Sequence, residues 1–363
     1  MHEKMFSKYW VDKRGDFMSY SKIFIITDSR SSSGGVESMH QLASQINNLG
    51  GKAYIYYRDL GIKTNYDNVP SKFHNYNIQT VNKIEDNEDN LMIVPEIYTS
   101  MLYKHNKINK CIWWLSLDFY FDSCSYVKTA KRIVELKKLA ANLYPLVAGA
   151  LWFKRFPNKY FKFGSDKNEI MHFYNCEYIK QYLLNKGIEN KNTYYLCGPI
   201  RDEYFENKNI VNKLSQVAYN PAKGLEFSEK IINYMKQHMD DTITFIRLTG
   251  MKPEEMVETL GKSKVYMDFG YFPGPERIPR EAVTMHCNLI TSTSGSAAND
   301  IDVPIPRTFK FKPKDSNLKN ICENIQELVN NYDEHVNKYD SYRVKVRNQK
   351  NLFNQTIYRL FKN

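Results

Sequence analysis

The segment from residue 264 to residue 296 constrains the fold of this chain more than any other. It opens with a short apolar run, Lys264–Phe269, which is typical of a buried strand, and it continues as a Gly- and Pro-rich loop. The proline that closes the loop suits a first helical position, where a fixed φ and a missing N–H cost nothing. We therefore predict a helix over Arg280–Cys287, with Glu281 in its first turn, and a second strand over Asn288–Thr291.

The same order of strand, small-residue loop, helix and strand occurs near the start of the chain. Lys22–Thr27 is an apolar run of strand length, and the loop after it contains Gly34 and Gly35. Apolar residues then recur at helical spacing before a further apolar run at Lys52–Tyr57. The two glycines either serve a tight turn or let backbone N–H groups approach a phosphate closely, and both interpretations remain open.

Two more apolar runs, Leu91–Glu96 and Lys110–Asp118, are predicted to be buried strands that end in an acidic residue. Ligands of open α/β sheets bind at the carboxyl ends of the strands. Glu96 and Asp118 are therefore expected at a cleft, although either could instead cap a helix or pair with a lysine.

A second set of strands and helices follows a polar connection, so the sequence predicts two doubly wound α/β domains that face a cleft. The predicted boundaries are 1–205 for the N-terminal domain, 206–340 for the C-terminal domain and 341–363 for a C-terminal helix that packs back on the first domain.

The composition excludes several classes of protein. The six cysteines form no C-x-x-C pair, and the eight histidines lack the H-E-x-x-H spacing, so free core thiols and no metal site are expected. No run reaches the roughly 18 apolar residues that a membrane span needs. The net charge of +11 suits an anionic partner. We expect a cytoplasmic protein.

Residues 128–162 have an unusual charge bias. Nine Lys and Arg residues stand against the single acid Glu135, and aromatic residues such as Trp152 and Phe156 lie between them. This combination favours peripheral contact with an anionic membrane surface, while a basic helix with a core loop is the alternative. The nine basic residues are Lys128, Lys131, Arg132, Lys137, Lys138, Lys154, Arg155, Lys159 and Lys162.

The whole order of elements resembles that of the GT-B glycosyltransferases, which transfer a sugar from a nucleotide-activated donor between two Rossmann-like domains. The resemblance covers about residues 20 to 340 and is strongest over 220–296, where it is similar to lipopolysaccharide and capsule transferases. It aligns Gly34-Gly35 with the glycine pair of the first loop, and Lys223-Gly224 with a Lys-Gly whose lysine is expected at the donor phosphates. Glu281-Ala282 matches the second half of the E-x7-E motif, whose glutamate is expected on the donor ribose.

The chain departs from this family at two positions. Pro273 stands in place of the first acid of E-x7-E, and Glu276 lies in a different register. Val217 occupies the position of the arginine that usually precedes the phosphate-binding lysine, so one of three other arginines is expected to supply that charge. The donor sugar and the stereochemical course therefore stay open. The three arginines are Arg247, Arg277 and Arg280.

The chemistry of the reaction assigns roles to these residues. Breaking a glycosyl–phosphate bond builds negative charge on the leaving phosphate, so Lys223 is expected there, and Glu281 on the ribose. An inverting enzyme also needs a base for the acceptor, for which Asp118, Glu96 and His40 are candidates in that order. The predicted donor-binding residues are Gly34, Gly35, Asn220, Arg247, Glu276, Arg277, Arg280, Glu281, Ser294, Gly295 and Ser296.

The resemblance implies a nucleotide-sugar donor, a glycan or lipid-linked acceptor of surface polysaccharide synthesis, no cofactor or metal, and no nucleic acid partner. A nucleotide-sugar epimerase of the same fold is one alternative, which incubation with donor alone would reveal as an altered free sugar. A basic protein that binds polysaccharide or nucleic acid without catalysis is another, and salt-dependent binding to arbitrary DNA would favour it.

Overall fold

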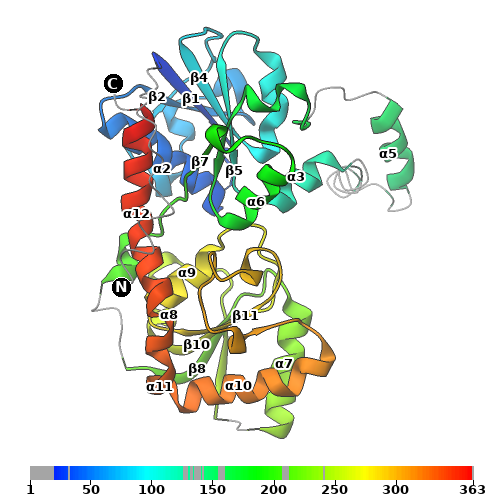
Figure 1. Cartoon of the computed structure of the whole chain (residues 1–363), viewed down its shortest axis with the longest axis vertical. Helices are drawn as coiled ribbons and strands as arrows, with labels where there is room; N and C mark the ends of the chain where they lie inside the picture. Colours follow the sequence, from blue (N-terminus) through cyan, green and yellow to red (C-terminus); the bar gives the residue numbers. More distant parts are fainter. Residues whose placement is uncertain are drawn as a thin grey trace.

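The computed structural model describes residues 20–31, 33–125, 130, 134, 140, 143–153, 160–206, 212–239 and 242–361. Two parallel β-sheets, each flanked by helices, lie one above the other along the long axis of the molecule (Figure 1). The long C-terminal helix runs beside both of them. The prediction of two doubly wound α/β domains is confirmed.

Within the described residues, the N-terminal sheet has seven parallel strands in the order β3-β2-β1-β4-β5-β6-β7. The strands are β1 Lys22–Thr27, β2 Ala53–Tyr57, β3 Gln79–Thr80, β4 Asn90–Pro95, β5 Asn109–Trp114, β6 Met171–Tyr174 and β7 Thr193–Tyr195. The helices of this half are α2 Gly34–Asn48, α3 Leu117–Cys124, α5 Tyr144–Phe153 and α6 Glu177–Asn185.

The C-terminal sheet has five parallel strands among the described residues, in the order β12-β11-β10-β8-β9. They are β8 Leu214–Tyr219, β9 Thr244–Arg247, β10 Ser263–Asp268, β11 Asn288–Ser292 and β12 Lys310–Phe311. The helices of this half are α7 Leu225–His238, α8 Pro253–Lys262, α9 Arg277–Thr284, α10 Leu318–Asn330, α11 Tyr332–Val336 and α12 Asp340–Phe361.

Strand β1 shows why a strand in the interior of this sheet is a continuous apolar run. Ile23 and Ile25 join a hydrophobic cluster with α2 on one face of the sheet, whereas Phe24 and Ile26 join a cluster with α6 on the other face. Successive side chains of a strand point to opposite faces, so a sheet covered on both sides needs apolar residues at every position.

Helix α12 bridges the two halves of the molecule (Figure 1). Tyr342 and Val346 pack into the hydrophobic cluster of the C-terminal sheet, and Phe353, Ile357 and Leu360 pack into that of the N-terminal sheet. One rigid helix that buries apolar side chains in both cores limits the freedom of the two sheets to move relative to each other.

Two of the predicted boundaries that differ from the structure change the position of a candidate site residue. Helix α9 begins at Arg277 rather than Arg280, so Glu281 lies beyond its first turn. Proline is tolerated throughout a first turn because the first N–H groups of a helix have no intrahelical partner, so Pro279 did not mark the start. Strand β5 ends at Trp114, and Asp118 instead lies in the first turn of α3.

The other properties of the chain follow its composition. All six cysteines are free, and five of them are buried, as predicted. No helix among the described residues is long and apolar enough to cross a bilayer. Eight of the nine basic residues predicted to contact a membrane lie outside the described residues, and only Lys162 lies within them.

Candidate functional site

The strand order of the C-terminal sheet creates a crevice between β8 and β10. From β8 the chain proceeds to β9 on one side, and it then returns to β10 on the other side of β8. Ligands of doubly wound sheets bind outside the carboxyl ends of the strands at such a reversal. Lys223 follows β8 there, and the loop 269–276 follows β10 and leads into α9.

Close backbone contacts hold the loops of this crevice together. Gly224 has a φ of +67°, and a Cβ atom there would lie 2.8 Å from the backbone N of Gly270. Only glycine accommodates both constraints, so the β8–α7 loop packs directly on the end of β10. The Oγ of Ser296 donates to the carbonyl of Gly274 at 2.8 Å. This hydrogen bond joins the loop after β11 to the loop 269–276.

The N-terminal sheet reverses its order between β1 and β4, and the start of α2 lies at that reversal. Ser33 caps α2, because its side chain accepts a hydrogen bond from the N–H of Val36. A Cβ atom on Gly34 would lie 2.6 Å from Cδ of Arg277 in the C-terminal half. The glycine therefore leaves room for the stem of this arginine, and the two crevices meet at this contact.

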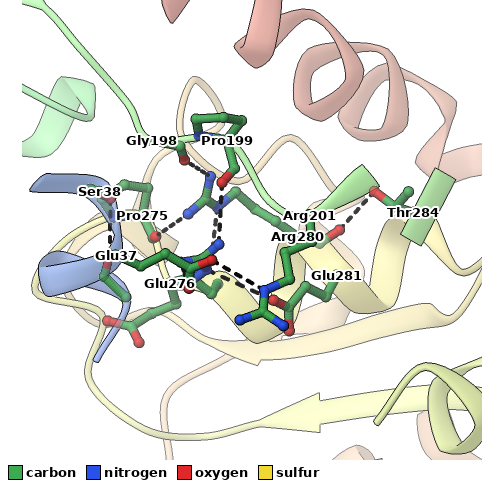
Figure 2. Close-up of polar contacts among 12 residues, drawn as sticks. Glu37, Ser38, Gly198, Pro199, Arg201, Pro275, Glu276, Arg280, Glu281 and Thr284 are labelled. Atoms are coloured by element: carbon green, nitrogen blue, oxygen red, sulfur yellow. Dashed lines mark hydrogen bonds and ion pairs between the residues drawn. The ribbon is translucent and has the colours of Figure 1, made fainter. Parts of the chain in front are cut away.

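A charged network joins the two halves at this point. Glu37, on the first turn of α2, accepts hydrogen bonds from Arg277 at 2.8 Å and from Arg201 at 3.1 Å. Figure 2 shows Glu37 and Arg201 pointing toward each other from different parts of the chain. Arg277 also lies 3.8 Å from Glu281, one helical turn along α9. The network brings Gly34, Arg277 and Glu281 together.

Lys223 lies beside this network and pairs with Glu276, the N-cap residue of α9, at 2.8 Å. The Lys223 side chain is 36% exposed and that of Glu276 is 21% exposed. A partly exposed pair of this kind contributes little to stability, since water screens it. The ammonium group is therefore accessible at the crevice.

Arg280 has a different environment from the other predicted donor ligands. It is buried, and its guanidinium donates to the carbonyls of Gly198 at 3.0 Å and Pro275 at 3.2 Å (Figure 2). It also donates to the Oε1 of Gln349 on α12 at 2.9 Å and to the carbonyl of Glu276. In this structure the guanidinium connects α9, the segment after β7 and α12.

Glu281 is nearly buried, with 8% of its surface exposed. Burial raises the pKa of its carboxyl group, although the nearby Arg277 and Arg280 act in the opposite direction. Its electrostatic interaction with Tyr204 contributes to a raised pKa of that tyrosine, after burial as the main cause. Glu281 therefore lies between an arginine and a tyrosine.

The three candidate bases have unequal positions. Asp118 is partly exposed in the first turn of α3, close enough to Tyr271 of the β10–α9 loop to contribute to that tyrosine's raised pKa, which burial mainly causes. Glu96 is 2% exposed and accepts the N–H of Leu115 at 2.9 Å. His40 is fully buried, and its ring nitrogens contact the carbonyl of Val36 and the hydroxyl of Tyr57. Only Asp118 of the three reaches the surface between the domains.

Glu96 binds the segment 115–117, because its carboxyl group accepts the N–H of Leu115. This segment contacts the other half of the molecule, since Leu117 donates its N–H to the carbonyl of Pro273 at 3.2 Å. Gly274 lies against the carbonyl of Leu115 on the same segment. Glu96 thus fixes the piece of the N-terminal domain on which the β10–α9 loop rests.

Glu96→Gln is expected to become increasingly favourable as pH rises. Burial raises the pKa of Glu96 to about 8, so between about pH 4.5 and pH 8 the folded protein retains a proton that the unfolded chain releases. The free energy of unfolding of the wild type therefore falls over this range, and a glutamine avoids the loss. Urea titrations at pH 5 and pH 8 should show a relative gain of roughly 3 kcal/mol for the variant.

The matched control for this prediction is Glu258→Gln on the exposed face of α8. The Lys262 ammonium lowers the pKa of Glu258, so this carboxyl is ionised in the folded protein at both pH values and largely ionised in the unfolded chain. Its difference from the wild type should change little between pH 5 and pH 8. An equally flat result for Glu96→Gln would contradict a protonated Glu96.

The remaining predicted residues lie on the loops and at the end of β9, along the same edge of the C-terminal sheet. The Oδ1 of Asn220 accepts the N–H of Ala222 at 3.0 Å and shapes the loop that carries Lys223. Arg247 is exposed at the end of β9. The carbonyl of Ser294 accepts the N–H of Phe272, and Gly295 forms a bridge with the same residue.

Sequence reasoning missed three residues of the interface. Glu37 and Arg201 complete the charged network, and Asp302 accepts the N–H groups of Glu177 and Tyr178, both at 2.8 Å. A carboxylate of the C-terminal half therefore caps α6 of the N-terminal half. The acid three residues after Gly34 was visible in the sequence, but its partners lie 164 and 240 residues further along the chain.

One described cavity lies away from both crevices. It has a volume of about 170 Å³ and is lined by residues at the amino ends of β5 and β6, among them Asn109 and Met171. Since ligands of this type of sheet bind at the carboxyl ends, we do not place the site there. No group of three or more His, Cys, Asp or Glu side chains in the described part of the chain is arranged to hold a metal ion.

The two facing Rossmann-like domains, with their crevices in contact, define the GT-B fold. Among solved structures, the chain is similar to a glycosyltransferase from Rickettsia africae at 14% identity, with a TM-score of 0.52 over 95% of this chain and 99% of that one. It is also similar to HepE from Anabaena in complex with UDP and glucose, at 9% identity and a TM-score of 0.56, covering 93% and 98% of the two chains.

A third similar structure is the N-terminal domain of trehalose-6-phosphate phosphatase from Candida albicans. Its identity is 9% and its TM-score is 0.59, over 96% of this chain and 98% of that one. At such identities the likeness concerns the fold. No family model and no curated protein sequence matches the chain.

Proposed function

We propose that this protein is a glycosyltransferase that moves a sugar from a nucleotide-activated donor to a glycan or lipid-linked glycan acceptor in surface polysaccharide synthesis. The observation that carries the proposal is the position of Lys223. It follows β8 at the strand reversal of the C-terminal sheet and contacts the N-cap of α9, next to the arginine that lies against Gly34. A cation and a helix start at this position suit a diphosphate.

The chemistry of glycosyl transfer assigns a role to each group. The bond between the sugar and the phosphate breaks, and Lys223 meets the charge that develops on the leaving diphosphate. Glu281 accepts hydrogen bonds from the ribose hydroxyls, and Glu276 orients Lys223. Asp118 removes the proton of the acceptor hydroxyl if the reaction inverts the anomeric centre. The similar Anabaena protein, which binds UDP and glucose, supports a nucleotide-sugar donor.

A thermal-shift screen against UDP, GDP, dTDP, ADP and CMP tests the proposal most directly. A ligand that binds only the folded protein at 100 times its Kd stabilises it by about 2.7 kcal/mol. One nucleotide should raise the melting temperature clearly more than the other four. The corresponding sugar nucleotides should then release that nucleotide when an acceptor glycan is present. No shift with any of the five, or turnover of the donor sugar without transfer, would reject the transferase.

Membrane contact is a second part of the proposal, and helix α5 supports it. The ten residues of α5, YPLVAGALWF, contain no charged side chain. Leu146 is 71% exposed, and Figure 1 shows α5 set apart from the rest of the N-terminal half. The segment 128–162 around it carries nine basic residues and one acid. We propose that this apolar helix enters the surface of an anionic bilayer and presents the crevice to a lipid-linked acceptor.

Charge reversal at Lys137, Lys138, Lys154 and Arg155 is expected to release the protein from anionic vesicles. Each basic residue near such a surface contributes about 1 kcal/mol, so the partition coefficient should fall at least about tenfold. Co-sedimentation with phosphatidylglycerol vesicles at low salt measures it.

A second variant tests the apolar part of this contact. Leu146→Asp should weaken the binding that persists at high salt, whereas Ile62→Asp, at a site that is 82% exposed, should not. Activity on a soluble acceptor should remain in all variants. Failure of the wild type to sediment would reject the membrane contact and leave the transferase proposal intact.

A further inference from the structure

Glu37 draws together side chains from three separate parts of the chain. Its two carboxylate oxygens accept hydrogen bonds from Arg277 and Arg201, and its Oε1 also accepts one from the hydroxyl of Tyr76 at 3.3 Å. The residue is 5% exposed, and the Arg277 side chain is 18% exposed. Burial removes the hydration of the charged groups, so a buried ion pair is stable only where hydrogen bonds and charge attraction offset that cost.

The positive charge around Glu37 exceeds the negative charge. Besides the two arginines, Lys72 interacts electrostatically with Glu37, and burial lowers the pKa of this lysine. Burial works against the ionised form of Glu37, but Arg277 and Arg201 outweigh it, and the pKa is lowered. The second acid, Glu281, lies 3.8 Å from Arg277. Three cations, Arg277, Arg201 and Lys72, thus stand against two acids, Glu37 and Glu281.

The position of this cluster coincides with the expected diphosphate site. Cδ of Arg277 is the atom that a Cβ on Gly34 would meet, so its guanidinium lies at the start of α2, where free N–H groups favour an anion. Glu37 is bound to this guanidinium through a carboxylate oxygen. A phosphate group makes the same charge-assisted hydrogen bonds to arginine, so the two anions use the same donor.

We propose that Glu37 competes with the diphosphate of the donor for Arg277. It holds the guanidinium against the start of α2 until phosphate oxygens replace the carboxylate, and its charge lowers the affinity of the site for anions. The inference rests on the proposed function, since it assumes that a nucleotide diphosphate binds between the two crevices.

Calorimetry with inorganic pyrophosphate tests the competition without knowledge of the base or the sugar. Glu37→Gln retains the shape of the side chain and can still accept a hydrogen bond, but it removes the competing charge. It should bind pyrophosphate at least about threefold more tightly than the wild type, because charge-assisted bonds are roughly twice as strong as neutral ones. Arg277→Gln should bind it at least about tenfold more weakly.

The double variant and a surface control complete the experiment. Glu37→Gln combined with Arg277→Gln should show no gain over Arg277→Gln alone, and Glu258→Gln should equal the wild type. Tighter binding in a protein that is no more stable than the wild type is a result that a merely structural role of Glu37 would not produce.

Several outcomes would overturn the inference. Equal or weaker binding by Glu37→Gln would mean that Glu37 positions Arg277 for the ligand, and absence of pyrophosphate binding in both proteins would remove the site. If a nucleotide stabilises the wild type while Glu37→Gln shows no gain, the competition fails and the proposed function stands. If pyrophosphate behaves as expected and no nucleotide binds, the proposed function fails, and the inference fails for a nucleotide donor, although Glu37 then still competes with phosphate groups for Arg277.

Discussion

Arg280→Ala is expected to reduce the free energy of unfolding by about 3–5 kcal/mol, the largest effect of any substitution considered for this chain. The side chain is buried and donates to the carbonyls of Gly198, Pro275 and Glu276 and to the amide of Gln349. Alanine would leave these acceptors without a partner and would open a cavity between α9 and α12. Urea denaturation followed by circular dichroism measures the loss.

Arg280→Lys should recover only a small part of this stability, because an ammonium group has neither the planar geometry nor the reach to contact all these acceptors. Arg307→Ala is the matched control. Its side chain is 86% exposed and pairs with Asp300, so its loss should change stability by less than about 1 kcal/mol. If Arg280→Ala also reduced the free energy of unfolding by less than about 1 kcal/mol, this result would contradict the structural role of Arg280. Arg280 would then return to the donor-binding candidates.

Lys223→Ala is expected to lower kcat about 100-fold or more, while the Kd for the nucleoside monophosphate changes by less than about threefold. The ammonium group acts on the phosphate that is bonded to the sugar, because this phosphate gains negative charge when the glycosyl bond breaks. The nucleoside monophosphate lacks that phosphate. Steady-state kinetics with the sugar nucleotide chosen by the thermal-shift screen, together with calorimetry, separates the two effects.

Lys230→Ala on α7 provides the control for this variant. Lys230 pairs with Asp315 on the exposed surface, at 3.0 Å, so its removal changes the net charge equally without touching the crevice. Its kcat should match that of the wild type. If Lys223→Ala retains kcat and shows only a raised KM, another cation meets the leaving phosphate, and Arg277 is the next to substitute.

Local sequence patterns predicted the strands of this protein well. Strand β1 has the predicted bounds, Lys22–Thr27. This prediction succeeds because its signal, a short apolar run, is local. The start of α9 was predicted wrongly, because a proline is compatible with any position of a first turn. Pro279 alone therefore does not mark the first helical residue.

The candidate site divides in the same way. Lys223, Glu276 and Glu281 were identified from the resemblance to GT-B glycosyltransferase motifs, and the structure places the first two 2.8 Å apart. Arg280 was one of three arginines expected to supply the charge that Val217 lacks, whereas the structure engages its guanidinium with Gly198 and Gln349. Which of two neighbouring arginines faces the crevice depends on the direction that each side chain takes from the helix.

The sequence by itself therefore determined the alternation of strands and helices, the two-domain α/β class and the loops at which a ligand would bind. These properties follow from periodicity, from glycine and proline, and from the rule that parallel strands present their carboxyl ends together. Only the tertiary structure decided that Glu37 meets Arg201 and Arg277, that Asp302 caps α6 and that Glu96 is buried. Such pairings join residues far apart in the chain, and burial and partner choice arise only when both sheets and α12 pack together.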